Sequence, residues 1–188
     1  MADTNNTELF KYLRLYLGKD SWNLLRKMTP KELKMFQKVD INPDISYFVK
    51  GNQDILMKFK ALYLTRCVKK KSLYTQCSIY DYAEGFSTAD NDEFGLSVSK
   101  DLLFLYMHCH ITDLGRSRQW LTSTVINKIA DRNRVGLVTV LLSEISVSEF
   151  ETCGEMKVID FGAIATADIL DNMDTGGSST SKGYGTSI

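Results

Sequence analysis

Residues 45–58 read Ile-Ser-Tyr-Phe-Val-Lys-Gly-Asn-Gln-Asp-Ile-Leu-Met-Lys, and they carry the strongest structural signal of the chain. Their first part is an apolar run that suits a buried strand and ends at Gly51. A helical spacing of apolar residues then continues through Met57, Phe59 and Leu62. This order of strand, glycine turn and helix predicts the first unit of a parallel α/β sheet.

The chain after residue 45 repeats this alternation of short apolar runs and helical patterns, which is typical of a parallel sheet with crossover helices. We predict strands near residues 45–49, 72–77, 101–107, 136–142 and 157–161. Helices are expected at 53–68, 79–86, 117–133, 145–151 and 163–173. The predicted fold class is therefore α/β, a three-layer arrangement around a parallel sheet of about five strands.

The residues before this sheet read as helices, at 8–17 and from Asp20 to Leu25. Residues 29–32, Thr-Pro-Lys-Glu, combine a capping box with proline at the first helical position, which predicts a third helix to about Lys38. Asn42, Pro43 and Asp44 then break the chain. We divide the protein into a helical appendage at 1–44, an α/β domain at 45–174 and a Gly/Ser/Thr-rich disordered tail at 175–188.

The composition bears on the partners and the cellular compartment to be expected. The chain has 23 Lys and Arg against 23 Asp and Glu, so no overall charge attracts it to nucleic acid or to a membrane. The four cysteines are scattered, and we expect reduced thiols in a cytoplasmic protein. The apolar runs are shorter than the ~20 residues that span a bilayer, so no membrane partner is expected.

The turn at Gly51 has the layout of a phosphate-binding loop without its functional residues. Such a loop reads G-x-x-x-x-G-K-[ST], in which backbone amides and the lysine hold the phosphates. Counting from Gly51, the second glycine falls on Leu56, the lysine on Met57 and the hydroxyl residue on Lys58. Asp54 adds a negative charge close to the expected phosphate position.

Taken in order, the segments from Gly51 to about Phe150 resemble the ATPase core of DnaC-type bacterial replicative helicase loaders and of the related IstB-type transposition ATPases. Gly51 and Asn52 match a Gly-Asn phosphate loop, and residues 72–81 match a strand that opens a short helix. Residues 101–107 take the place of the strand that ends in magnesium-binding acids. Residues 125–144 resemble the helix and strand that follow, with Ser143 in its family position.

The chain departs from this family pattern at each catalytic position. Tyr106 and Met107 stand where an acidic pair should hold magnesium, and Glu144 replaces the polar sensor asparagine. No arginine follows Arg134, so the C-terminal sensor arginine is also missing. The resemblance therefore implies a degenerate AAA+ or RecA-like P-loop domain, a pseudo-ATPase with no catalytic residues and no cofactor. The degenerate nucleotide-site positions are Gly51, Asn52, Asp54, Met57, Lys58, Tyr106, Met107 and Glu144.

The expected function is that of a non-catalytic, replication-associated accessory protein, similar to a helicase loader, from a phage or mobile element. It would bind a protein partner, such as a replicative helicase or another ATPase, and single-stranded DNA. Three alternatives stay open. They are an active NTPase that uses Lys58, an inhibitor or decoy of a host replication or defence protein, and an unrelated α/β domain in which Gly51 only ends a strand.

Two further clusters have a structural and a functional interpretation. Lys69, Lys70, Lys71, Arg116 and Arg118 form a possible nucleic-acid contact, which Arg132 and Arg134 would join, although cations also stabilise helix C-termini. The segment from His108 to His110 contains both histidines of the chain, too few ligands for a metal, so no metal site is expected.

Overall fold

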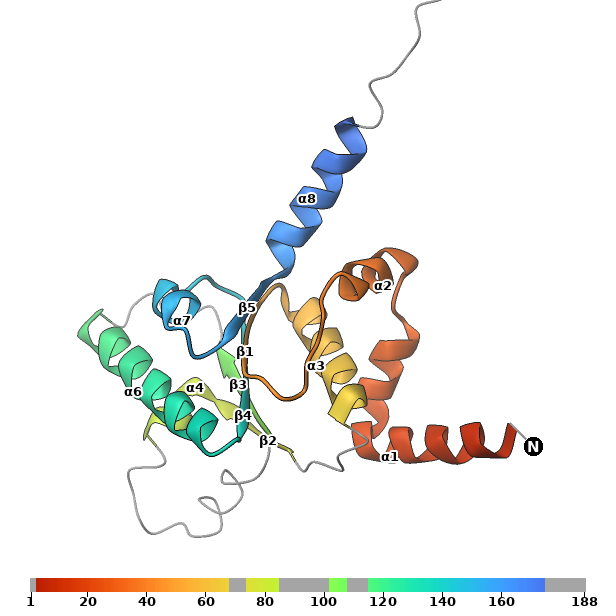
Figure 1. Cartoon of the computed structure of the whole chain (residues 1–188), viewed down its shortest axis with the longest axis horizontal. Coiled ribbons are helices and arrows are strands. Elements are labelled where there is room, and N and C mark those ends of the chain that lie inside the picture. Colours follow the sequence, from red (N-terminus) through yellow and green to blue (C-terminus); the bar gives the residue numbers. More distant parts are fainter. Residues whose placement is uncertain (1–2, 68–73, 85–101, 108–114, 175–188) are drawn as a thin grey trace, which may run out of the picture.

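The structure is a computed structural model that describes residues 3–67, 74–84, 102–107 and 115–174 (Figure 1). Side chains are described at 14–67, 74–84, 102–107 and 118–167. The predicted disordered tail at 175–188 and the segment from His108 to His110 therefore lie outside the described residues.

A single parallel sheet forms the middle of the molecule. Its strands are β1 (Tyr47–Lys50), β2 (Tyr74–Ser78), β3 (Leu102–Met107), β4 (Val138–Ser143) and β5 (Lys157–Asp160), in the spatial order β2-β3-β4-β1-β5. All neighbouring strands pair in parallel. The five strands predicted from the sequence are thus confirmed, as is the parallel α/β class.

The helices of the described residues are α1 (Asp3–Arg26), α2 (Pro30–Gln37), α3 (Gln53–Cys67), α4 (Ile79–Glu84), α6 (Gly115–Arg134), α7 (Ser148–Thr152) and α8 (Phe161–Asp174). The two helices predicted before residue 26 correspond to the two parts of α1, which is kinked at Gly18 with φ 75° and ψ 163°. That conformation is essentially restricted to glycine. Figure 1 shows that the two parts of α1 run in different directions, and that α8 extends away from the sheet.

Helices cover both faces of the sheet, as a three-layer fold requires (Figure 1). Successive side chains of a strand point to opposite faces. Tyr47 and Val49 accordingly pack with α1, α2 and α3, whereas Phe48 packs with α4, α6 and α7. All three side chains are fully buried, and burial of a side chain of this size stabilises the fold by about 2 kcal/mol.

The N-terminal helices pack on the sheet. Leu17 of α1 and Met35 and Phe36 of α2 belong to the same buried cluster as β1, β3 and β4. The predicted capping box is present at the start of α2, where the backbone N–H of Glu32 donates to Thr29 Oγ1 and the N–H of Thr29 donates to the Glu32 carboxylate. The division of the chain at residue 44 stays a prediction, but α1 and α2 contribute to the core.

The order of the strands creates a point where the chain reverses direction. From β1 the chain passes over β4 and β3 to the edge strand β2, returns through β3 and β4, and then crosses β1 to reach β5. The helix after β1 and the helix after β4 therefore lie on opposite faces. In open parallel sheets, ligands bind in the crevice outside the carboxyl ends of the strands at such a point.

Candidate functional site

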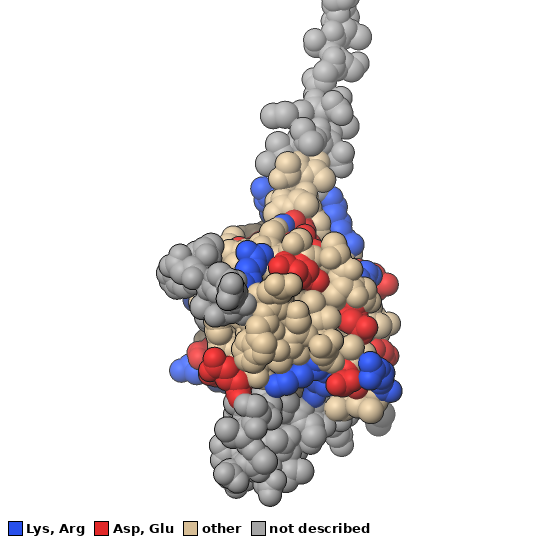
Figure 2. Space-filling model, turned by 90° about the vertical axis from the view of Figure 1, so that its left-hand side faces the viewer, with Lys and Arg blue, Asp and Glu red and all other residues tan. Residues whose placement is uncertain are grey.

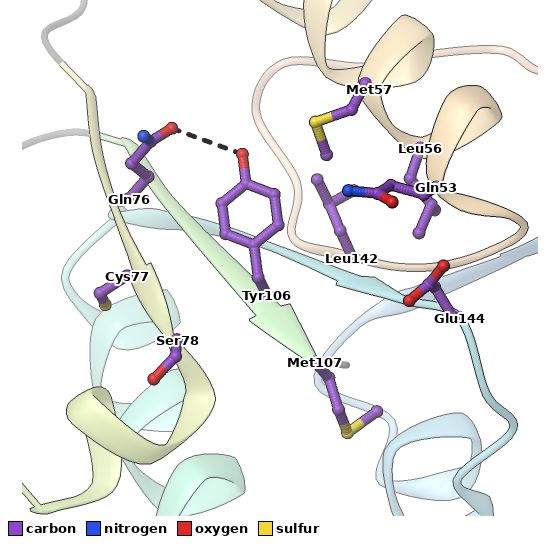
Figure 3. Close-up of a pocket in the computed structure, with 10 residues that line it drawn as sticks. All are labelled: Gln53, Leu56, Met57, Gln76, Cys77, Ser78, Tyr106, Met107, Leu142 and Glu144. Atoms are coloured by element: carbon purple, nitrogen blue, oxygen red, sulfur yellow. Dashed lines mark hydrogen bonds between the residues drawn. The ribbon is translucent and has the colours of Figure 1, made fainter. Parts of the chain in front are cut away.

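A cavity of about 280 Å³ lies at the carboxyl ends of β2, β3 and β4, beside the first turns of α3 (Figure 3). Its size is close to the lower limit of small-molecule sites, and its position is the one expected for a ligand crevice. Its lining residues are Gln53, Leu56, Met57, Gln76, Cys77, Ser78, Tyr106, Met107, Leu142 and Glu144. This cavity is the candidate functional site.

Gly51 lies between the interior strand β1 and α3, as the comparison with a phosphate loop requires, but its backbone has no need for glycine. Its N–H donates to the carbonyl oxygen of Ser143 at 3.1 Å, which extends the pairing of β1 with β4. A Cβ at this position would lie 3.5 Å from atoms of Ile55 and Phe161, an ordinary contact distance. The turn is therefore a strand end that any small residue would fit.

Asn52 satisfies the N-terminus of α3 from within the chain. Its Oδ1 accepts a hydrogen bond of 3.0 Å from the N–H of Ile55, and its backbone oxygen accepts one from the N–H of Leu56. Asparagine is among the preferred residues at a helix N-cap. The Ile55 amide, one of the first-turn donors that could otherwise hold an anion, is thus already bonded to a side chain.

Lys58 points away from the cavity. Its Nζ lies 2.6 Å from Glu32 Oε1 and 2.6 Å from Asp54 Oδ2, so the ammonium bridges α2 and α3. Hydrogen bonds to Asp54 and Glu32 raise the pKa of Lys58, and the bond to Lys58 is the main cause of the lowered pKa of Glu32. Both Asp54 and Lys58 are therefore engaged in an ion-pair cluster outside the cavity, whereas the sequence suggested that both would lie near a phosphate.

The helix geometry of α3 explains this separation. Residues three or four apart in a helix share a face. Gln53 and Met57 share the face that lines the cavity, and Figure 3 shows their side chains entering it from α3. Asp54 and Lys58 share the adjacent face, which meets α2.

Tyr106, Met107 and Glu144 line the cavity from the ends of β3 and β4. Tyr106 Oη donates to Gln76 Oε1 over 3.4 Å (Figure 3). Glu144 is the only Asp, Glu, Lys, Arg or His among the described lining residues. The site thus brings together Met57, Tyr106, Met107 and Glu144, with a single carboxylate among them.

Burial keeps two ionisable groups of the lining, Cys77 and Tyr106, in their neutral forms. Burial raises the pKa of the Cys77 thiol to about 11, so it is protonated at neutral pH. Burial also raises the pKa of the Tyr106 hydroxyl. The cavity thus holds a neutral thiol and a neutral phenol beside the Gln53 and Gln76 amides, the Ser78 hydroxyl and the Glu144 side chain.

Lys60 is the residue of this region that sequence reasoning missed. It is 9% exposed, and its ammonium lies 5.4, 5.2 and 5.3 Å from the ring centroids of Tyr74, Phe104 and Tyr106. Its Nζ also donates to Gln76 Oε1. Burial lowers the pKa of Lys60 to about 8. Its spacing of three residues from Met57 was the available signal, because residues three apart share a helix face.

The predicted basic cluster is only partly described. The side chains of Lys69, Lys70, Lys71 and Arg116 lie outside the described ones. Arg118 Nη2 lies 3.5 Å from Glu149 Oε2. Arg134 pairs with Asp131 at 2.7 Å.

Arg132 does not belong to a surface cluster, contrary to the expectation. It is 7% exposed and donates to Thr139 Oγ1 and to the carbonyl oxygen of Val138, so it ties α6 to β4. Figure 2 shows the face seen from the side of α6 and α7, where blue and red areas are interspersed. No continuous basic surface is visible on that face among the coloured residues.

Within the described part of the chain, no group of three or more His, Cys, Asp and Glu side chains is placed to hold a metal ion. The helices of the described residues include none with the length and apolar character needed to cross a membrane.

No protein-family model matches the sequence, and no curated protein matches it.

Proposed function

We propose that the protein is a non-catalytic, replication-associated accessory protein, similar to a helicase loader, that acts by binding another protein. The observation that carries the proposal is the chemistry of the cavity. The crevice has the apolar side chains of Met57 and Leu56 where the resemblance would put the phosphates, while Lys58 is held by Glu32 and Asp54. Phosphoryl transfer depends on positioned cations and magnesium ligands, and the described lining supplies no Lys or Arg and a single carboxylate, that of Glu144.

The arrangement of the elements supports the resemblance on which this proposal rests. Gly51 follows an interior parallel strand and precedes α3, and the ends of β3 and β4 lie beside that turn. These are the relative positions that the family pattern assigns to its phosphate loop, its magnesium-binding strand and its sensor strand. The proposal of an NTPase that uses Lys58 is less well supported, because Lys58 lies outside the cavity lining.

Calorimetric titration with ATP and magnesium tests the loss of the nucleotide site. We expect no binding at micromolar concentrations and no phosphate release. Lys58→Ala is the control variant for the NTPase alternative. Micromolar ATP binding that disappears in Lys58→Ala, or ATP turnover by the native chain, would overturn the proposal.

The N-terminal helix is the proposed contact with the partner, since the resemblance places the helicase-binding part before the ATPase core. Leu15 of α1 is 83% exposed and lies just before the kink at Gly18. An exposed leucine next to a hinge suits an anchor that fills an apolar groove of a partner.

Binding to the purified replicative helicase of the host tests this contact. We expect Leu15→Glu to weaken binding about tenfold or more, since truncation of an interface anchor typically costs over 1 kcal/mol. Val135→Glu changes a residue that is 72% exposed at the other side of the fold and serves as the matched control. The proposal would be contradicted if the helicase did not bind the native chain, or if it bound Leu15→Glu and Val135→Glu equally well. Helicase activity measured with and without the native chain separates a loader from an inhibitor.

Single-stranded DNA is the second proposed ligand, and its contacts would be Lys69, Lys70, Lys71, Arg116 and Arg118. Binding through phosphate contacts should weaken steeply as salt is added.

A further inference from the structure

Lys60 is a buried cation without an anionic partner among the described residues. Its ammonium is surrounded by the rings of Tyr74, Phe104 and Tyr106 and bonds to a neutral amide oxygen of Gln76. Most lysines that are buried this far are paired with a carboxylate. The surroundings of Lys60 thus fix the position of its ammonium but supply no anionic group to pair with it among the described residues.

The cavity adjoins this cation through a shared wall. Gln76 and Tyr106 contact Lys60 on one side and line the cavity on the other. Gln76 is exposed, so its side chain can turn towards solvent and leave the ammonium open to the cavity. Tyr106 presents a ring to the same space, and Met57 and Leu142 supply apolar contacts (Figure 3).

We propose that this cavity binds a small organic anion with a single ring, whose carboxylate or phosphate replaces the Gln76 amide oxygen on the Lys60 ammonium. The ring lies against Met57, Leu142 and the face of Tyr106. A volume of about 280 Å³ suits a molecule of this size. The site lies on the β2 and β3 side of the cavity, so it does not depend on the turn at Gly51 or on the proposed protein partner.

The chemistry of Lys60 agrees with this assignment. Burial is the cause of its lowered pKa, and no charged group adds to the shift. A bound anion restores the stability of the protonated form, because an opposite charge at hydrogen-bond distance favours the ammonium. The ring faces of the three aromatic residues keep the cation in position while the site is empty.

Titration of the full-length chain with benzoate and with phenyl phosphate tests the proposal, and neutral benzamide is the reference ligand. Methionine-methyl NMR spectra locate the ligand, because Met57 lines the cavity and Met35 lies on α2. We expect at least one of the two anions to bind about tenfold more tightly than benzamide and to shift the Met57 signal, since its hydrogen bond is charge-assisted. The preferred anion identifies the head group.

Two variants and a control then assign the effect to Lys60. Lys60→Met should abolish the preference for the anion over benzamide, whereas Gln76→Ala should strengthen anion binding about threefold by removing a competing acceptor. Lys128→Met is the matched control, because Lys128 also lies over a ring, that of Tyr82, but on the opposite face of the sheet. Equal binding of anions and benzamide by the native chain, or an unchanged preference in Lys60→Met, would overturn the proposal.

Discussion

The buried ammonium of Lys60 destabilises the fold. Its ammonium loses most of its hydration, and the rings and the Gln76 amide compensate for only part of this loss. The free energy involved is set by the difference between the ordinary lysine pKa of 10.5 and the pKa of about 8 in the fold. That difference corresponds to about 3 kcal/mol.

Stability should therefore depend on pH through Lys60 in a defined direction. Because the folded pKa is lowered, the unfolded chain binds the proton more tightly, and the penalty is complete below pH 8 and disappears between pH 8 and 10.5. We expect Lys60→Met to be more stable than the native chain at pH 7. This advantage should fall by about 3 kcal/mol by pH 10.5.

Denaturant unfolding of both proteins at each pH measures this difference. The comparison cancels the titration of the buried thiols of Cys67 and Cys77, whose pKa values burial raises to about 12 and about 11. Lys19→Met, at an exposed position of α1, controls for the loss of one surface charge. If the stability difference between Lys60→Met and the native chain stayed constant from pH 7 to 10.5, the burial of the Lys60 ammonium would be contradicted.

At the scale of elements, Glu32 connects two helices with one carboxylate. Its Oε2 closes the capping box of α2 on the Thr29 N–H, and its Oε1 binds Lys58 of α3. The Lys58 side chain is 9% exposed and that of Glu32 17%, whereas the Asp54 side chain is 59% exposed. The two carboxylates on one ammonium should therefore differ in their contribution to stability.

Double-mutant cycles measure that difference. We expect a coupling energy of about 1 kcal/mol between Glu32 and Lys58, since a hydrogen bond to a shielded charged group retains more of its strength. The exposed pair of Asp54 and Lys58 should give about 0.3–0.5 kcal/mol. The cycles use Glu32→Gln, Asp54→Asn and Lys58→Met, and urea unfolding is the measurement. Equal coupling energies in the two cycles would show that the Glu32–Lys58 pair between α2 and α3 stabilises the fold no more than the exposed Asp54–Lys58 pair.

Sequence patterns predicted the elements well because each depends on local periodicity. The strands are short apolar runs, and the capping box of α2 needs only Thr29, Pro30 and Glu32. The position of Lys58 was not predictable, because its direction depends on the docking of α2, which is a tertiary contact. The spacing of Lys60 could have indicated its helix face, but not its ring contacts, which come from β2 and β3.

At the scale of the whole molecule, the strand order also escaped prediction. Local patterns give the sequence of strands but not their neighbours, and the place of β1 between β4 and β5 is set by packing on both faces. The cavity was unpredictable for the same reason, because it forms only where α3 meets the ends of β2, β3 and β4.

The position of β1 has a consequence during synthesis. Its hydrogen-bonded neighbours are β4 and β5, with Tyr47 opposite Val140 and Lys157. A nascent chain on the ribosome therefore carries this apolar strand unpaired until most of the protein has been made. Such non-local pairing slows folding and exposes the chain to aggregation.

Pulsed hydrogen exchange during refolding tests this order of events. We expect amides of β3 and β4 to gain protection first, since these strands are joined through α6, and those of β1 to gain it only afterwards. Protection of β1 before β4 would contradict this sequence. The first strand of the chain is thus the one that stays unpaired longest during synthesis.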